Sequence, residues 1–118
     1  CSGKVYYDLL AARREKKITD IAIVRIEQLY PFPKESLHNE LAKYPKAAEI
    51  VWCQEEPRNQ GAWYWIASRQ HLENEIGLKQ KLLLVSRPAS SSPAVGYLAK
   101  HNEQQKALVE SALGKIEY

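Results

Sequence analysis

The sequence predicts an α/β protein, a three-layer α/β/α sandwich built on a mainly parallel sheet. Two patterns alternate along its 118 residues. Segments with apolar residues three or four positions apart are typical of amphipathic helices, and short, nearly continuous apolar runs are typical of strands buried on both faces. The connections between these segments are short, which favours βαβ units with parallel strands. The length suits one domain with a single core.

The first half of the chain is predicted to form a helix, a strand and a second helix. The helix begins at residue 2 or 3 and runs through residue 13, with basic residues at its end, where cations complement the helix dipole. Residues 20–27 are the clearest predicted strand because they contain a near-continuous apolar run, residues 21–24 and 26. Pro31 and Pro33 end the strand, and Pro33 suits the first turn of a helix that extends to about residue 44.

The second half continues the alternation. Residues 49–54 and 81–86 are predicted strands, and each is followed by a helix, over residues 62–75 and 97–113. Residues 87–96 contain serine, proline and glycine and are predicted to form a loop. The start of the chain is typical of a strand-to-helix turn, so the first strand of the sandwich is expected to lie upstream and to be truncated.

Composition limits the classes of protein to which the chain belongs. Basic and acidic residues are interspersed and the net charge is +3, which argues against a nucleic-acid surface. No apolar run approaches the roughly 20 residues that cross a membrane. Two cysteines, Cys1 and Cys53, form no disulfide framework, which favours a reduced intracellular setting. The absence of methionine indicates that residues 1–118 are one domain from a longer protein.

Two adjacent acids follow the strand predicted over residues 49–54. Acid–base catalysis by Glu55 and Glu56 would require shifted pKa values, whereas neighbouring loop residues usually point in different directions. We therefore predict that one carboxylate caps the next helix or pairs with Arg58. Several of the aromatic residues nearby are expected to contact another domain or subunit. The predicted structural and interface motif consists of Glu55, Glu56, Asn59, Gln60, Gly61 and Trp63.

A candidate anion site follows the strand at residues 81–86. Arg87 offers a forked cation and Ser90 to Ser92 offer hydroxyl donors, a combination that suits phosphate groups; a polar surface loop is the alternative. Lys4, at a helix start, is a weaker candidate. No glycine-rich phosphate loop or metal-ligand spacing is present. A catalytic triad is not expected, because all three histidines fall on predicted helices: His38, His71 and His101.

Four long motifs, taken together and in order, resemble a known family. They are Cys1–Leu9, Ile23–Pro33, Val51–Trp63 and Ser86–Gly96. They resemble the C-terminal domain of the thiamine-dependent first component of bacterial 2-oxoglutarate dehydrogenase complexes. The resemblance implies a fold like the transketolase C-terminal domain. It also implies a homodimeric enzyme that decarboxylates 2-oxoglutarate and passes succinyl to the lipoyl arm of dihydrolipoyl succinyltransferase, in the citric acid cycle.

The resemblance also implies that the cofactor sites of the enzyme lie outside this chain. Thiamine diphosphate and magnesium bind upstream domains, so no catalytic, cofactor-binding or metal residue is expected here and the fragment alone is predicted to be inactive. The domain is expected to serve dimer assembly and the binding of an acetyl-CoA or nucleotide effector. The effector residues are expected to be Arg87 and Ser90, with Ser2 and Lys4 as neighbours. The location would be the bacterial cytoplasm, or the mitochondrial matrix in a eukaryote.

Two alternatives remain open at this point. The chain is equally compatible with a related dehydrogenase that acts on 2-oxoadipate or a similar acid, because substrate choice would lie in upstream domains. A stand-alone nucleotide-binding or interaction module is the alternative from another class of protein.

Overall fold

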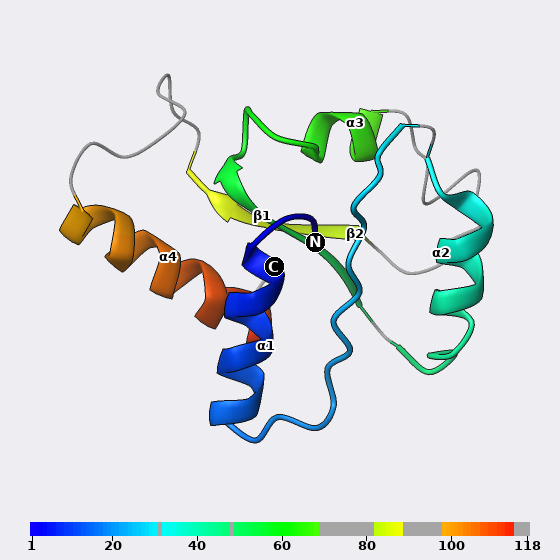
Figure 1. The fold of residues 1–118 in the computed structure, drawn as a ribbon, viewed down its shortest axis with the longest axis horizontal. Helices are drawn as coiled ribbons and strands as arrows, with labels where there is room; N and C mark the ends of the chain where they lie inside the picture. The colour runs from blue at the N-terminus through cyan, green and yellow to red at the C-terminus, as the bar shows by residue number, and fades with distance from the viewer. Residues whose placement is uncertain (31, 48, 69–81, 89–97, 115–118) are drawn as a thin grey trace.

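The computed structural model describes residues 1–30, 32–47, 49–68, 82–88 and 98–114. In chain order, the elements are α1 Val5–Glu15, α2 Lys34–Leu41, β1 Ile50–Pro57, α3 Trp63–Ser68, β2 Leu82–Arg87 and α4 Leu98–Leu113. Figure 1 shows α3 on one side of the strand pair and α1 and α4 on the other. The predicted α/β class is confirmed. No helix within the described ranges has the length and apolar character needed to cross a bilayer.

The two strands form a parallel pair, as the sequence predicts. The register runs from Ile50 opposite Leu82 to Cys53 opposite Val85. The next pair is Pro57 opposite Arg87, which is four positions further along β1 but only two further along β2. β1 therefore carries two extra residues near its carboxyl end, where it bulges away from its partner.

Alternation along the strands divides the core in two. Neighbouring residues of a strand point to opposite faces, and the buried side chains of β1 and β2 accordingly fall into two clusters. The α1/α4 core contains Val5, Leu9, Cys53, Val85, Leu108, Val109 and Leu113. The α2/α3 core contains Ile26, Phe32, Leu37, Trp52 and Ile66. Both faces of the strand pair are therefore buried, as a parallel sheet requires.

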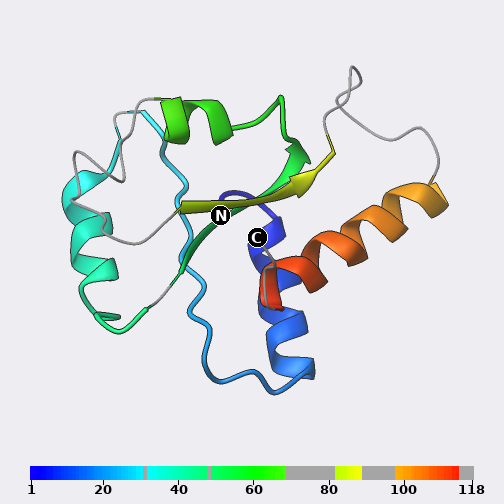
Figure 2. The same cartoon turned by 180° about the vertical axis from the view of Figure 1, so that it is seen from behind.

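The strand predicted over residues 20–27 is wrong, because residues 21–29 adopt no regular structure. A strand requires a hydrogen-bonded neighbour along its length, and among the described residues only Cys1 makes backbone-to-backbone hydrogen bonds with this segment. The Cys1 amino group donates to the Val24 carbonyl at 3.1 Å, and the Ile26 amide donates to the Cys1 carbonyl at 2.8 Å. Figure 2, from behind, shows the segment passing the N-terminus. An apolar sequence alone therefore did not produce a strand.

Two further predictions extend beyond the described residues. The helix predicted over residues 62–75 is observed as α3, and its remainder lies outside the described ranges. The same holds for the loop predicted over residues 87–96 after residue 88.

Cys53 is a free thiol in the α1/α4 core with 4% of its surface exposed. Burial raises the pKa of this thiol to about 11; the Cys1 amino group lowers it and the Glu55 carboxylate raises it further. A neutral, buried thiol of this kind is a poor nucleophile. Cys53 therefore contributes to packing rather than to chemistry.

The raised pKa of Cys53 predicts a loss of stability in alkaline solution. The unfolded thiol ionises near its ordinary pKa of 9.0 and the folded thiol near 11. The unfolded state therefore releases its proton first, and the free energy of unfolding should fall between these two pH values by about 2 kcal/mol in total. Urea unfolding of the 118-residue chain at a series of pH values measures this decline. A Cys53→Ala variant should show a shallower decline, and identical slopes would contradict the prediction.

Candidate functional site

Polar side chains meet where β1 and β2 end. Glu55 lies two residues after Cys53, and Arg87 lies two residues after Val85. Because the side chains of a strand repeat their direction every two residues, both Glu55 and Arg87 face the α1/α4 side. The carboxyl ends of parallel strands are the usual place for ligands in α/β sheets.

One hydrogen-bonded network joins these two residues to helices α1 and α4. Arg87 Nη1 lies 3.1 Å from His101 Nδ1, and Arg87 Nη2 donates to Gln105 Oε1 at 2.6 Å. Gln105 Nε2 donates to Asp8 Oδ2 at 2.8 Å and to Glu55 Oε1 at 3.0 Å. The Lys4 ammonium pairs with Glu55 Oε1 at 3.7 Å. We call this group the edge cluster; its members are Lys4, Asp8, Glu55, Arg87, His101 and Gln105.

The electrostatic feature of the edge cluster is a buried cation without a carboxylate partner. Arg87 is only 7% exposed, yet no carboxylate of the described residues lies within ion-pair distance of it. Its acceptors are a neutral amide and an imidazole nitrogen, and its buried Nε has no partner in the described part of the chain. A guanidinium has five N–H donors, and burying an unpaired charge is costly. These donors favour an anion.

The structure brings together two of the four predicted effector residues. Arg87 and Lys4 join the same network through Glu55 and Gln105. Ser2 makes none of the hydrogen bonds of this network among the described residues. Ser90 lies outside the described ranges.

Three members of the edge cluster were missed by the sequence reasoning: Asp8, His101 and Gln105. A signal for the last two was present. They lie four residues apart on α4, in line with the buried residues Leu108 and Val109, so they continue the core-facing stripe of that helix. Polar residues on such a stripe require polar partners across it.

The loop after β1 is organised by Gln54, which is 2% exposed. Its Oε1 accepts hydrogen bonds from Trp52 Nε1 at 2.9 Å and from the Trp63 amide at 3.0 Å. Its Nε2 donates to the carbonyls of Pro57 at 3.0 Å and Gln60 at 2.8 Å. One side chain thus joins the strand, the loop and the start of α3.

This arrangement corrects the role expected for the two acids. Gln54, not a carboxylate, bonds the first amide of α3, and neither Glu55 nor Glu56 pairs with Arg58 among the described residues. The tight turn expected at Gly61 is present, with φ of +68°. An added Cβ there would lie 3.0 Å from the Cβ of Glu56, so only glycine fits without strain.

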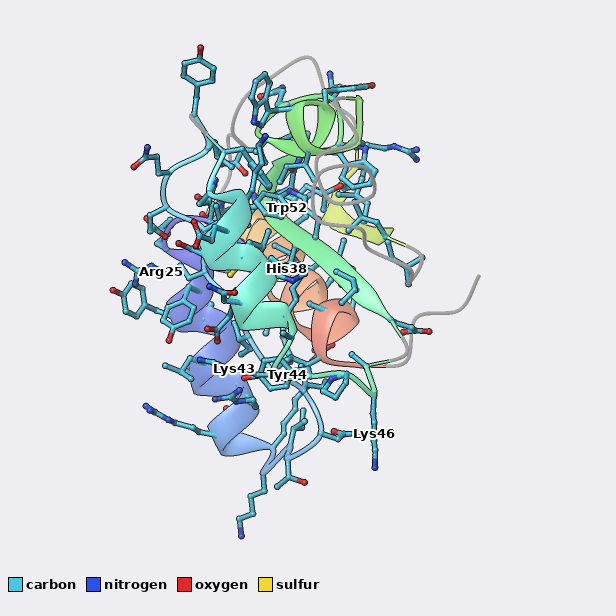
Figure 3. All side chains as sticks on the ribbon, turned by 90° about the vertical axis from the view of Figure 1, so that its right-hand side faces the viewer. Arg25, His38, Lys43, Tyr44, Lys46 and Trp52 are labelled. Carbon is cyan, nitrogen blue, oxygen red and sulfur yellow. The ribbon has the colours of Figure 1, made fainter. Side chains whose placement is uncertain are left out.

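A separate groove of about 410 Å³ lies between residues 23–28 and α2, with Tyr6 of α1 on its wall. Figure 3 shows this side of the molecule, with Arg25 beside α1. Arg25 donates to the Tyr7 hydroxyl at 3.0 Å, pairs with Glu27 at 2.7 Å and stacks 5.2 Å from the centre of the Tyr6 ring. The groove's main cation is therefore held by its own neighbours.

The described ranges contain no group of three or more His, Cys, Asp or Glu side chains arranged to hold a metal ion. The fold and the edge cluster thus define an α/β domain with a buried arginine at the carboxyl edge of parallel strands. Comparison with known proteins then identifies the family. A family model described as 2-oxoglutarate dehydrogenase C-terminal matches residues 1–113. The chain belongs to this family.

Curated relatives agree with the family model. The chain is 57% identical over 116 residues to the 2-oxoglutarate dehydrogenase E1 component of Cupriavidus necator, and the match covers 98% of this chain. It is 57% identical over 113 residues to the E1 component of Haemophilus influenzae, covering 96%. It is 51% identical over 115 residues to that of Azotobacter vinelandii, covering 95%. In each case the chain spans 12% of the relative's length.

Proposed function

We propose that this chain is the C-terminal, non-catalytic domain of a 2-oxoglutarate dehydrogenase E1 component. The observation that carries the proposal is the identity of 57% over almost the whole chain to proteins of that name. The full-length enzyme decarboxylates 2-oxoglutarate with thiamine diphosphate and magnesium, and transfers succinyl to the lipoyl group of the succinyltransferase. The described residues offer no metal-binding group, so no step of this chemistry is assigned to them. Because the relatives are bacterial, we assign the enzyme to the cytoplasm.

The full-length protein should turn over 2-oxoglutarate, and the 118-residue chain should not. The measurement is the reduction of an artificial electron acceptor in the presence of thiamine diphosphate and magnesium, with 2-oxoadipate assayed in parallel. A clear preference for 2-oxoadipate would identify the related dehydrogenase instead. Saturable micromolar binding of thiamine diphosphate to the isolated chain, measured by calorimetry, would contradict the non-catalytic role.

We infer that the edge cluster binds an anionic effector, a phosphate-bearing molecule such as acetyl-CoA or a nucleotide. The support is the buried Arg87, whose Nε has no partner among the described residues and whose two bonded acceptors carry no carboxylate charge. Lys4 adds a second, exposed cation, 3.7 Å from Glu55. Ser90 and Ser2 are the further hydroxyl donors that we propose for the site.

We propose that the whole domain is a three-layer sandwich like the transketolase C-terminal domain, completed by a strand that ends at Cys1. The bonds from Cys1 to Val24 and from Ile26 to Cys1 support this. In a parallel pair, one residue bonds the two residues that flank the residue opposite it. Cys1 does this with Val24 and Ile26, which flank Arg25. Cys1, Ile23 and Val51 all pack against the α1/α4 core, and we propose that the strand lies between β1 and residues 21–27 and joins them in one sheet.

Hydrogen exchange tests this strand at single residues. In the parallel pattern, the amides of Val24 and Ile26 point towards the proposed strand, and those of Ile23 and Arg25 point away from it. The full-length protein should therefore protect both Val24 and Ile26, whereas the 118-residue chain should protect Ile26 far better than Val24. Equal exchange of Val24 in the two proteins would contradict the proposed strand.

We further propose that the aromatic face beside α3 serves dimer assembly, together with the loop motif Glu55, Glu56, Asn59, Gln60, Gly61 and Trp63. Tyr30 is 82% exposed and Tyr64 is 57% exposed. The Tyr30 ring meets the Trp65 ring edge-on at 6.0 Å. Exposed aromatic side chains supply large contact areas and are frequent anchors of protein interfaces.

A further inference from the structure

The orientation of the Gln105 side chain is determined by its neighbours. Its carbonyl oxygen must face Arg87, since a guanidinium only donates, and its NH₂ group must face Asp8 and Glu55, since carboxylates accept. The distances of 2.6, 2.8 and 3.0 Å fit this single orientation. Gln105 therefore stands between the buried cation and two carboxylates without allowing a direct ion pair.

Among the described residues, the Asp8 side chain makes one hydrogen bond, and that bond belongs to the edge cluster. Its Oδ2 accepts from Gln105 Nε2, and its side chain is exposed on α1. Glu55, by contrast, is shared between Gln105 and Lys4. Of the two carboxylates, Asp8 is thus the one that acts on Arg87 through Gln105 alone.

We propose that Asp8 and Gln105 are positioning residues for Arg87, which fix its guanidinium so that its remaining N–H donors are preorganised for an anion. The proposal rests on the effector site proposed above and adds the residues that set its affinity. Two of the five donors of Arg87 are bonded to His101 and Gln105, and Asp8 keeps Gln105 in the acceptor orientation. Preorganisation lowers the entropic cost of binding.

This role has a signature that simple electrostatics does not share. If Asp8 acted only through its charge, removing that charge beside a cationic site would strengthen anion binding. If Asp8 positions Arg87 through Gln105, its removal must weaken anion binding, although Asp8 does not touch the ligand. The two mechanisms therefore predict changes in opposite directions.

The test uses the full-length enzyme and acetyl-CoA as the probe, with its dissociation constant measured by equilibrium titration. Asp8→Ala should weaken binding about five- to tenfold, which corresponds to the loss of one hydrogen bond. Asp8→Asn should stay within about twofold of the wild type, because its amide oxygen still accepts from Gln105. Tighter or unchanged binding by Asp8→Ala overturns the proposal. Glu15→Ala, at an exposed acid on the same helix, is the matched control and should bind normally.

A double-mutant cycle checks that Asp8 acts through Gln105. Gln105→Leu should weaken binding by itself, and adding Asp8→Ala should cause little further loss, because the intermediary is already absent. Additive losses overturn the proposed route. The Arg87→Ala variant separates the positioning role of Asp8 and Gln105 from the proposed effector site. If Arg87→Ala binds acetyl-CoA as the wild type does, the effector site itself is wrong. If Arg87→Ala loses binding while the Asp8 and Gln105 variants keep it, only the positioning role is wrong.

Discussion

Replacing Gln54 with leucine is expected to lower the free energy of unfolding by about 3–5 kcal/mol. Gln54 is almost completely buried and bonds two donors and several carbonyls within one loop. Leucine would leave the Trp52 indole N–H, the Trp63 amide and the loop carbonyls without partners, and each buried unsatisfied group costs about 1–3 kcal/mol. Urea unfolding followed by tryptophan fluorescence measures the loss, since both tryptophans contact Gln54.

A conservative variant separates hydrogen bonding from packing. Gln54→Glu has almost the same shape and still accepts from both donors, but it places a carboxylate against the carbonyls of Pro57 and Gln60. It should destabilise the chain about as strongly as leucine does. Gln28→Leu, at an exposed position, is the control and should change the free energy of unfolding by less than about 0.5 kcal/mol. A mild effect of both Gln54 variants would refute the role given to this side chain.

Replacing Arg87 with alanine in the full-length enzyme is expected to abolish the response to acetyl-CoA. The measured quantity is the ratio of turnover with and without acetyl-CoA, which should fall to about 1 because an effector that does not bind cannot shift an equilibrium. Arg87 is the buried cation of the edge cluster and has donors to spare. Without it, the exposed Lys4 is the only other cation of the cluster.

A second variant at Arg87 shows whether the guanidinium or only its charge is required, and a variant at Arg14 is the control. Arg87→Lys keeps the charge but loses the fork that matches phosphate oxygens, so it should retain only part of the response. Arg14→Ala, at an exposed arginine on α1, should respond like the wild type. A full response in the Arg87→Ala enzyme would remove the effector site from this domain.

Elements whose signal is local were predicted correctly from the sequence, whereas the strand predicted over residues 20–27, which depends on a neighbouring strand, was wrong. The sequences of α1, α2 and α4 have helical periodicity, and β1 and β2 pair with each other within the chain. Residues 20–27 have the most strand-like sequence, yet among the described residues only Cys1 makes backbone-to-backbone hydrogen bonds with them. Strand propensity is realised only through a partner strand.

The candidate site shows the same division. Arg87 was identifiable from its place at a strand end, Lys4 from its place at a helix start, and Gly61 because its turn requires positive φ. Gln105 and Gln54 were not identified, because a glutamine gives no hint of burial until its partners are known. Gln105 connects α4 to α1, and Gln54 connects β1 to the start of α3.

The bulge in β1 has a consequence for the lengths that this strand tolerates. Between Cys53 and Pro57, β1 holds an even number of extra residues relative to β2, so Gln54 and Glu55 keep their opposite faces. A single inserted or deleted residue before Gln54 would exchange the two, turning the loop anchor towards α4 and the acid towards Trp52. Homologous sequences that differ in length here should therefore differ by two residues, and parity becomes a criterion for aligning this region.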